Sequence, residues 1–309
     1  MRSTLMRTEL MFQVAILMRK AYGAYSGFMG TALITGATSG IGREFCWQVS
    51  KAGHNLVIVA RDQERLEALA HNIRRVNNVK VEVLPADLAD PEDLADVCMR
   101  LTVTGLERPP ASVTNFEDEE TLDQFPLVDD DDLHPVGLLI NAAGFGMARP
   151  FLDNAFDSEL YGLDVMVRAV MATCYYAGRA MRDAGRGTII NVSSVAADSG
   201  MGPYSAHKAW VRSFSEGLAE ELRDTGVSVT AVMPGLVKTE FHARAGVDFS
   251  ATPELAWSAP KKIVEQSLEA ARRGQTLFTP TVRYKVVAAA QRVLPRSVVR
   301  KVMRNLPHM

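Results

Sequence analysis

The sequence predicts an α/β fold in which a doubly wound parallel sheet carries helices on both faces. Three observations support this prediction. Short apolar segments alternate along the chain with longer segments of helical spacing, an order typical of a parallel sheet. The first apolar segment runs directly into a glycine-rich turn and a helix. Small or polar residues follow several expected strands, at the edge where open α/β sheets bind ligands.

Composition narrows the class of protein. The chain has 309 residues, of which 47% are hydrophobic and 23% charged, as in ordinary soluble globular proteins. A net charge of −2 gives no reason to expect nucleic acid as a partner. The cysteines Cys46, Cys98 and Cys174 lie far apart and form no metal-binding spacing. We therefore expect a cytoplasmic protein without a metal.

The N-terminal half of the expected domain alternates strands and helices regularly. The apolar run at Ala32–Ile34 predicts the first strand, and Phe45 and Val49 belong to the helix that follows it. Pro91 opens a later helix directly after Asp90, a favoured capping residue. Further strands are expected at Asn55–Ala60, Val79–Leu84 and Val136–Ile140, and a further helix at 62–76.

The second half continues the alternation up to about residue 281. Strands are expected at Thr188–Val192, Val227–Met233 and Gln275–Phe278, and helices at 157–183, Tyr204–Arg223 and 253–273. One domain over residues 30–281 accounts for the whole pattern, since α/β domains of this length are common.

Three segments fall outside the pattern. The apolar stretch within residues 1–29 is too short to span a bilayer. We expect either an amphipathic helix that lies on the domain or on a membrane, or an extension upstream of the true start. Residues 102–135 carry runs of acidic residues and predict a solvated surface insertion, with an acidic docking loop as the alternative. The tail 282–309 is basic and amphipathic, divided by Pro295. It either packs on the domain or lies on a membrane or substrate channel.

The glycine-rich turn predicts a dinucleotide site. Gly36, Gly40 and Gly42 stand between a strand and a helix, the context that gives such a turn its meaning. Glycines let the backbone approach a pyrophosphate, and the helix N-terminus directs free N–H groups at its charge.

The end of the second strand bears on the choice of cofactor. Arg61 follows Ala60 directly, and its planar guanidinium can pair with a ribose 2′-phosphate. We therefore favour NADP(H) over NAD(H). In the alternative, Arg61 is a solvated loop residue and Asp62 caps the next helix.

Tyr204 and Lys208 predict acid–base chemistry. Residues four apart share one face of a helix. A phenol has an ordinary pKa of about 10, and a neighbouring ammonium is expected to lower it. Tyr204 could then exchange a proton with a carbonyl or alcohol oxygen, while the Ser194 hydroxyl holds the same oxygen.

Together these motifs resemble the short-chain dehydrogenase/reductase family over roughly residues 30–280. The resemblance implies a Rossmann-type fold and catalytic roles for Ser194, Tyr204 and Lys208. Asp87 matches the family's adenine-side acid. The cofactor contacts implied are Gly36, Thr38, Ser39, Gly40, Ile41, Gly42, Arg61, Asp87, Leu88, Asn141, Ala142, Gly144, Tyr204, Lys208, Pro234, Gly235, Val237 and Thr239.

Two departures from the family pattern stand out. Met166 occupies the position of the family's catalytic asparagine, and a thioether donates no hydrogen bond. The loop between Ser194 and Tyr204 is short, which leaves a choice between Ser193 and Ser194; we select Ser194 because Ser193 continues the strand.

The leading prediction is an NADP(H)-dependent reductase of a lipophilic ketone or 3-oxoacyl group. The tail and Arg61 look most like the branch of DltE-type and very-long-chain 3-oxoacyl reductases. Alternatives are a cofactor-binding regulatory protein that has lost catalysis, and an alcohol or steroid dehydrogenase. We expect a homodimer through helices 157–183 and 204–223, and a lid at about 236–260 with Phe241, Phe249 and Trp257 as candidate wall residues.

Overall fold

A single parallel sheet organises the molecule. The structure is a computed structural model that describes residues 30–103, 134–146, 149–241 and 252–303. In these ranges the strands follow the order β3-β2-β1-β4-β5-β6-β7. They are β1 (Thr31–Thr35), β2 (Asn55–Ala60), β3 (Val81–Pro85), β4 (Val136–Asn141), β5 (Gly187–Val192), β6 (Val227–Val232) and β7 (Leu277–Phe278). The predicted doubly wound α/β fold is confirmed.

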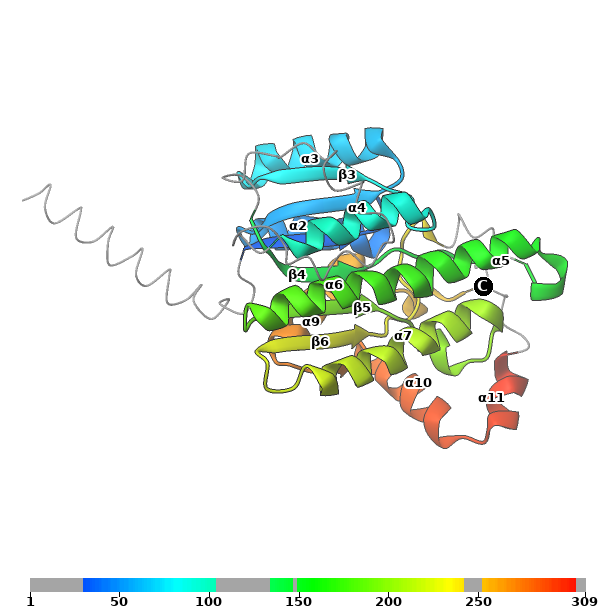
Figure 1. Ribbon diagram of the computed structural model, residues 1–309. Coiled ribbons are helices and arrows are strands. Elements are labelled where there is room, and N and C mark those ends of the chain that lie inside the picture. The colour runs from blue at the N-terminus through cyan, green and yellow to red at the C-terminus, as the bar shows by residue number, and fades with distance from the viewer. Residues whose placement is uncertain (1–29, 104–133, 147–148, 242–251, 304–309) are drawn as a thin grey trace, which may run out of the picture.

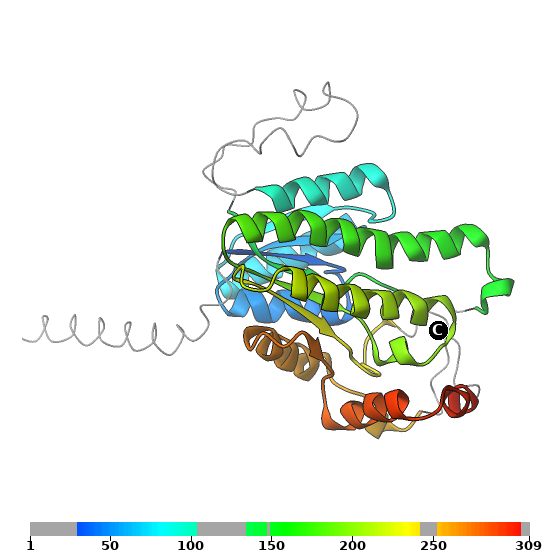
Figure 2. The same ribbon diagram turned by 60° about the horizontal axis from the view of Figure 1, so that its bottom comes forward.

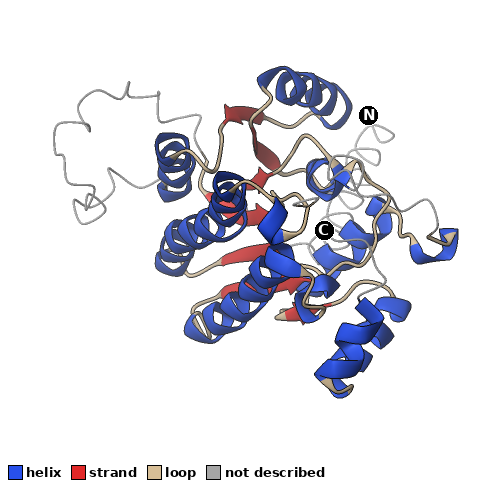
Figure 3. Ribbon diagram, turned by 90° about the vertical axis from the view of Figure 1, so that its right-hand side faces the viewer, coloured by secondary structure: helices blue, strands red, loops and turns tan. Residues whose placement is uncertain are grey.

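Helices cover both faces of the sheet (Figure 3). One layer holds α2 (Gly40–Lys51), α3 (Gln63–Asn77) and α9 (Pro260–Arg272), and the other holds α4 (Pro91–Thr102), α6 (Ala169–Asp183) and α7 (Gly202–Glu221). Alternate residues of each strand feed two separate cores, so Leu33 packs with one layer while Ala32 and Ile34 pack with the other.

The order of strands places the candidate site. The chain moves outward from β1 to β3 and then returns to β4 on the other side of β1. Successive strands are added toward one edge of the sheet from β1 to β3, and toward the other edge from β4 onward. Ligands bind beyond the strand ends at such a switch point. Figure 1 shows both strands in the middle of the sheet.

Two predicted helices are interrupted. The segment expected as one helix over 157–183 consists of α5 (Phe156–Leu163), a π-helical turn η5 (Asp164–Arg168) and α6. The segment expected over 253–273 begins with a 3₁₀ turn, η7 (Glu254–Ala256), and α9 starts only at Pro260. Proline has no N–H and suits the first turn of a helix, which explains the later start.

Two predicted strands are shorter than expected. Strand β3 begins at Val81 rather than Val79, because Asn78 ends α3 in the left-handed conformation with φ 51°. The last strand consists only of Leu277 and Phe278.

The tail forms α10 (Val282–Val293) and α11 (Arg296–Met303), separated at Pro295 as expected. Helix α10 packs against η6 (Val195–Asp198), the turn that follows β5. Figure 2 shows both helices, orange to red, outside the sheet layers at one end of the molecule. Among the described helices, none has the length and apolar character needed to cross a bilayer. The extension 1–29 and most of the acidic insertion lie outside the described residues.

Candidate active site

A cavity of about 840 Å³ lies beyond the carboxyl ends of the central strands. Its walls come from the glycine-rich turn, the segments after β4, β5 and β6, the start of α7 and helix α10. This is the edge of the sheet that the sequence predicted for ligand binding.

The glycines of the glycine-rich turn let a ligand come close to the backbone of the turn. Gly36 and Gly40 have φ values of +67° and +52°, where side chains are strained. A Cβ on Gly42 would lie 2.2 Å from the carbonyl oxygen of Gly36. Ser39 makes no side-chain capping bond to α2, whose first turn has no acidic residue. This N-terminus fits a pyrophosphate.

Thr35 joins the first and fourth strands beside this turn. Its hydroxyl accepts hydrogen bonds from the backbone N–H groups of Ala142 and Ala143, at 3.1 and 3.2 Å. The segment after β4 is thereby held against the glycine-rich turn.

The Asn141 side chain does not line the cavity, and its predicted contact with the cofactor stays a prediction. Its side chain is 4% exposed, donates to Asn191 Oδ1 at 2.9 Å and accepts from Thr173 Oγ1 at 3.0 Å. It does not line the cavity, because it points from β4 into the buried layer under α6. Asn141 joins two strands and a helix instead.

At one end of the cavity, Arg61 and Asp87 are linked by a tyrosine that the sequence analysis missed. Arg61 donates to the Tyr161 hydroxyl at 2.8 Å, and that hydroxyl lies 2.9 Å from both carboxylate oxygens of Asp87. All three residues line the cavity. Nothing in the sequence signalled Tyr161, since it comes from α5, 100 residues after Arg61.

Arg65 is a second missed residue at this end. It donates to the backbone oxygen of Thr38 at 3.0 Å and pairs with Glu240 at 3.3 Å. Asp62 caps α3 by accepting from the N–H of Arg65, as one alternative proposed. The signal for Arg65 was available, because it lies in the first turn of α3, four residues after Arg61, and both line the cavity.

Tyr204 and Lys208 lie together on the first turns of α7. They are 6% and 5% exposed, and the Lys208 Nζ atom is 5.9 Å from the centroid of the Tyr204 ring. Nζ also donates to the carbonyl oxygen of Val192 at 2.9 Å, which holds the ammonium at the end of β5.

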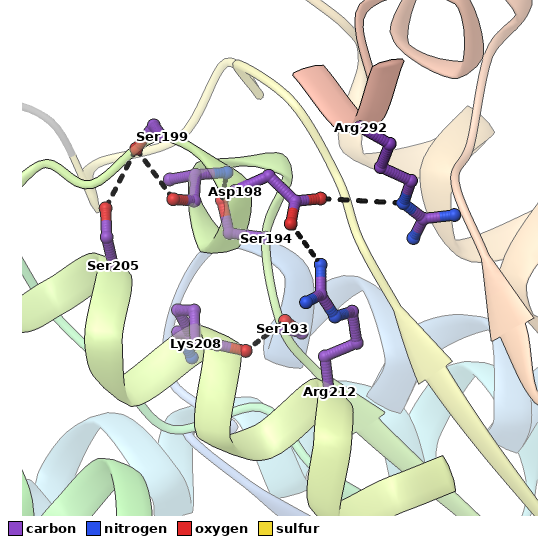
Figure 4. Close-up of polar contacts among 9 residues, drawn as sticks. Ser193, Ser194, Asp198, Ser199, Ser205, Lys208, Arg212 and Arg292 are labelled. Atoms are coloured by element: carbon purple, nitrogen blue, oxygen red, sulfur yellow. Dashed lines mark hydrogen bonds and ion pairs between the residues drawn. The ribbon is translucent and has the colours of Figure 1, made fainter. Parts of the chain in front are cut away.

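The two serines after β5 face different partners. Ser194 makes a side-chain hydrogen bond with Tyr204 and also accepts from the N–H of Ala196 at 3.1 Å. The Ser193 hydroxyl instead donates to the backbone oxygen of Lys208 at 2.7 Å, as Figure 4 shows. This geometry supports Ser194 as the serine that would meet a substrate.

Burial governs the pKa values of Tyr204 and Lys208. It raises the pKa of the Tyr204 phenol to about 12, and the hydrogen bond from Ser194 only partly opposes the rise. Burial also lowers the pKa of the Lys208 ammonium to about 8. In the protein alone, desolvation thus sets the pKa of Tyr204, and its lowering by Lys208 together with a bound nicotinamide stays a prediction. Tyr204 is protonated at neutral pH, the state a proton donor needs.

The segment that carries Ser194 is anchored by an ion-pair cluster. Asp198 lies between Arg212 of α7, at 2.5 Å, and Arg292 of α10, at 3.7 Å (Figure 4). Ser199 and Ser205 are hydrogen-bonded at 2.9 Å on the other side of the same turn. Helix α10 is thus tied to the turn that positions Ser194, a contact without any sequence signal.

Met166 is the residue predicted to replace the asparagine of the family pattern. It is fully buried and lies within the π-helical turn η5. A Cβ built on Gly144 would be 3.3 Å from Lys208 Nζ and 3.5 Å from Met166 Sδ. The Lys208 ammonium and the Met166 thioether therefore both face Gly144, and a thioether is at most a weak acceptor.

We expect Met166→Asn to raise turnover about tenfold, because an amide oxygen gives Lys208 a stronger acceptor than sulfur. The effect is measured as the steady-state kcat for reduction of the carbonyl substrate. Met99→Asn, at a position 37% exposed on α4, is the matched control. An unchanged or lower kcat in Met166→Asn contradicts this role for position 166.

Residues after β6 and in α10 complete the cavity wall. The ring of Phe241 lies 5.8 Å from that of Tyr204. The Tyr284 ring covers Gly235, where a Cβ would be 2.1 Å away, and its hydroxyl accepts from the N–H of Leu236 at 3.0 Å. Val287 and Gln291 also line the cavity and were missed. Trp257 does not line it, and Phe249 lies outside the described residues.

The predicted site residues, Asn141 excepted, all line this one cavity. They are Gly36, Thr38, Ser39, Gly40, Ile41, Gly42, Arg61, Asp87, Leu88, Ala142, Gly144, Ser194, Tyr204, Lys208, Pro234, Gly235, Val237 and Thr239. Their assembly in one place is an observation; their individual roles stay predictions.

The fold and this site define an oxidoreductase of the Rossmann class, and comparison with known sequences identifies the family. The sequence model of the short chain dehydrogenase family matches residues 30–104 and 111–248. The chain therefore belongs to the short-chain dehydrogenase/reductase family.

Individual relatives are moderately similar. A sulfoacetaldehyde reductase of Chromohalobacter salexigens is 32% identical over 235 residues, which are 72% of this chain and 78% of that protein. A very-long-chain 3-oxoacyl-CoA reductase of Anas platyrhynchos is 29% identical over 242 residues, 74% of this chain and 66% of that enzyme's length.

Solved structures of family members match the whole fold. A short-chain dehydrogenase from Sphingobium yanoikuyae in complex with NADPH is 29% identical, with a TM-score of 0.70 over 90% of this chain and 96% of that one. A bulky-bulky ketone specific alcohol dehydrogenase from Comamonas testosteroni is 28% identical, with a TM-score of 0.66 over 89% of this chain and 94% of that one.

Proposed function

We propose that this protein is an NADP(H)-dependent reductase that converts a lipophilic ketone or 3-oxoacyl group to an alcohol. The observation that carries the proposal is the buried, protonated Tyr204, hydrogen-bonded to Ser194 and adjacent to Lys208 within the cavity. The glycine-rich turn and the open N-terminus of α2 line the same cavity and fit a dinucleotide.

Each side chain has a defined task in this proposal. The nicotinamide, when bound, supplies a hydride to the carbonyl carbon. Tyr204 donates its phenolic proton to the carbonyl oxygen, and the Ser194 hydroxyl orients that oxygen. The Lys208 ammonium stabilises the phenolate that is left and binds the ribose hydroxyls. Thr239, after Pro234 and Gly235, holds the carboxamide.

The character of the wall supports a lipophilic substrate. The cavity lining includes Phe145, Met201 and Phe241, and on the side of α10 it includes Tyr284 and Val287. Apolar walls with a few convergent polar groups are typical of pockets for apolar small molecules. Relatives named for 3-oxoacyl and bulky ketone substrates agree with this assignment.

A regulatory, cofactor-binding role without catalysis is the second candidate, and Met166 is the observation that favours it. An enzyme that oxidises an alcohol is the third. The Ser194, Tyr204 and Lys208 group gathered in one cavity supports catalysis over a purely regulatory role, and the direction of the reaction rests on the proposed preference for NADP(H).

NADPH consumption with a panel of ketones, aldehydes and 3-oxoacyl thioesters tests the proposal. The account expects turnover of at least one lipophilic carbonyl, with the alcohol identified as the product. NADPH binding without turnover across the panel, equal in Tyr204→Phe, would favour the regulatory role.

The preference for NADP(H) is carried by Arg61 and Arg65. Replacing Arg61 by Ala removes one charge-assisted contact to a 2′-phosphate, worth about 1.5–3 kcal/mol. We expect the KM for NADPH to rise about 10- to 100-fold, while the KM for NADH changes little. Arg75→Ala, on the exposed side of α3, is the control and leaves both unchanged. Equal effects on the two cofactors would contradict the assignment.

The proposal includes a homodimer in the cytoplasm. Exposed apolar side chains on α5 and α6 supply a surface for a second copy: Leu160, Leu163, Met171 and Tyr175. Light scattering checks the dimer, and a monomer at working concentration would exclude it. Peripheral membrane contact, also part of the proposal, falls on residues 1–29 or on the basic segment 282–309.

A further inference from the structure

Helix α10 buries one face against the domain and exposes apolar residues on the opposite face. Its inner face holds Tyr284, Ala288 and Gln291, which are 9%, 6% and 7% exposed and pack toward the cavity and η6. A surface helix of a globular protein normally turns polar residues outward once its inner face is buried. The outward face of α10 does not follow that pattern.

The outward face is an apolar stripe at helical spacing, which we call the outer stripe. It consists of Val282, Val286, Ala289 and Val293, spaced i, i+4, i+7 and i+11, so that they share one side of the helix. The three valines are 76%, 63% and 84% exposed in the described part of the chain. Leu294 and Val298 continue the apolar surface toward α11 at 44% and 42% exposure.

The same segment is strongly positive. Residues 282–309 include seven Lys and Arg and no Asp or Glu, although the whole chain has a net charge of −2. Lys285 and Lys301 are exposed on α10 and α11. An apolar helix face flanked by basic residues is the pattern of helices that lie in a membrane interface.

We propose that α10 and α11 dock on an anionic lipid bilayer, with the outer stripe among the acyl chains and the basic residues at the phosphates. Charge complementarity favours this occupant over a second copy of the chain. Two copies joined through this face would bring together two basic segments that contain no acidic residue of their own, whereas anionic headgroups neutralise cations such as Lys285 and Lys301.

The docking surface and the cavity share one helix. Val287 and Gln291 line the cavity from the side of α10 that faces away from the outer stripe. A bilayer against the outer stripe thus lies one helix diameter from the cavity. Docking would thus place the cavity next to a membrane in which a lipophilic carbonyl substrate is dissolved, an inference that rests on the proposed function.

Co-sedimentation of the full chain with lipid vesicles tests docking independently of catalysis. Vesicles of phosphatidylcholine alone are compared with vesicles that also contain phosphatidylglycerol. The account expects binding to the anionic vesicles that weakens with added salt, and little binding to the neutral ones. The combined variant Val282→Ser, Val286→Ser and Val293→Ser should reduce binding by about tenfold or more, since each valine contributes apolar burial.

Two controls make the outcome specific. Val76→Ser, at a position 62% exposed on α3, should leave vesicle binding unchanged. Lys301→Glu should weaken binding to anionic vesicles only. The unfolding midpoint of each variant shows that the fold is retained, whether or not a substrate has been found.

Three results would overturn the proposal. They are equal binding of the triple variant and the parent to anionic vesicles, equal binding of the parent to neutral and anionic vesicles, and a loss of dimer mass in the triple variant. The last result would assign the stripe to a second copy. Failure of every carbonyl substrate would remove the proposed function and leave the docking result standing.

Discussion

Tyr204→Phe is expected to lower kcat/KM for carbonyl reduction by about 1,000-fold, within the range for loss of a positioned general acid. The change removes one oxygen from a ring that is 6% exposed and leaves the packing against Phe241 intact. The phenol is the proton donor beside Ser194, and the pKa of about 12 keeps it protonated at neutral pH. Steady-state NADPH consumption measures the loss.

Cofactor binding separates this result from a general defect. NADPH affinity, followed by fluorescence, should change less than about threefold because the phenyl ring still fills its place. Tyr176→Phe, which packs against the same core from α6, is the matched control and should keep full activity. A Tyr204→Phe enzyme with more than a tenth of the parent's activity would contradict the assigned role.

Lys208→Met is expected to make the protein more stable at pH 7 and nearly inactive. Burial lowers the pKa of Lys208 to about 8 from its ordinary 10.5, so the folded state disfavours the charge. At about 1.4 kcal/mol per pKa unit, the buried charge costs about 3 kcal/mol below pH 8. The Val192 carbonyl loses its partner in the variant at a cost of about 1 kcal/mol, which leaves a net gain of about 2 kcal/mol.

The gain should depend on pH with a definite sign. Between the folded and ordinary pKa values of Lys208, the unfolded parent binds more protons, so the parent's stability rises with pH. The advantage of Lys208→Met therefore shrinks from pH 8 to about pH 10.5. Tyr204 is present in both proteins, and its titration largely cancels in the difference.

Denaturant unfolding at pH 7 and at pH 10 measures both free energies. Reduction of the carbonyl should fall about 100-fold, as for loss of a preorganised donor. Lys238→Met, which removes an exposed lysine outside the α7 helix, is the control and should not show the pH dependence. A variant less stable than the parent at pH 7 would contradict the account.

The sequence was informative wherever one local geometry demands one residue type. Gly36 is required by its positive φ, and Gly42 is required because a Cβ there would collide with the backbone of Gly36. Tyr204 and Lys208 could be paired because their spacing on a helix fixes their shared face. Alternation of strands and helices sufficed for the sheet, since parallel strands require crossover helices.

Contacts between distant elements could not be found in this way. Tyr161 reaches Asp87 from another helix, and Arg292 reaches Asp198 from the tail. Asn141 was placed among the cofactor residues only by resemblance to the family, and the direction of its side chain is set by the buried partners Asn191 and Thr173. Periodicity also gave no sign of the π-helical turn at Met166, which leaves the apolar spacing nearly unchanged.

Transfer of deuterium from NADPH labelled at the nicotinamide C4 position tests the central claim most directly. The parent enzyme should place the label on the carbinol carbon of the alcohol, and Tyr204→Phe, with NADPH bound, should place almost none there. Unlabelled product from the parent, or equal label from both proteins, would contradict the account.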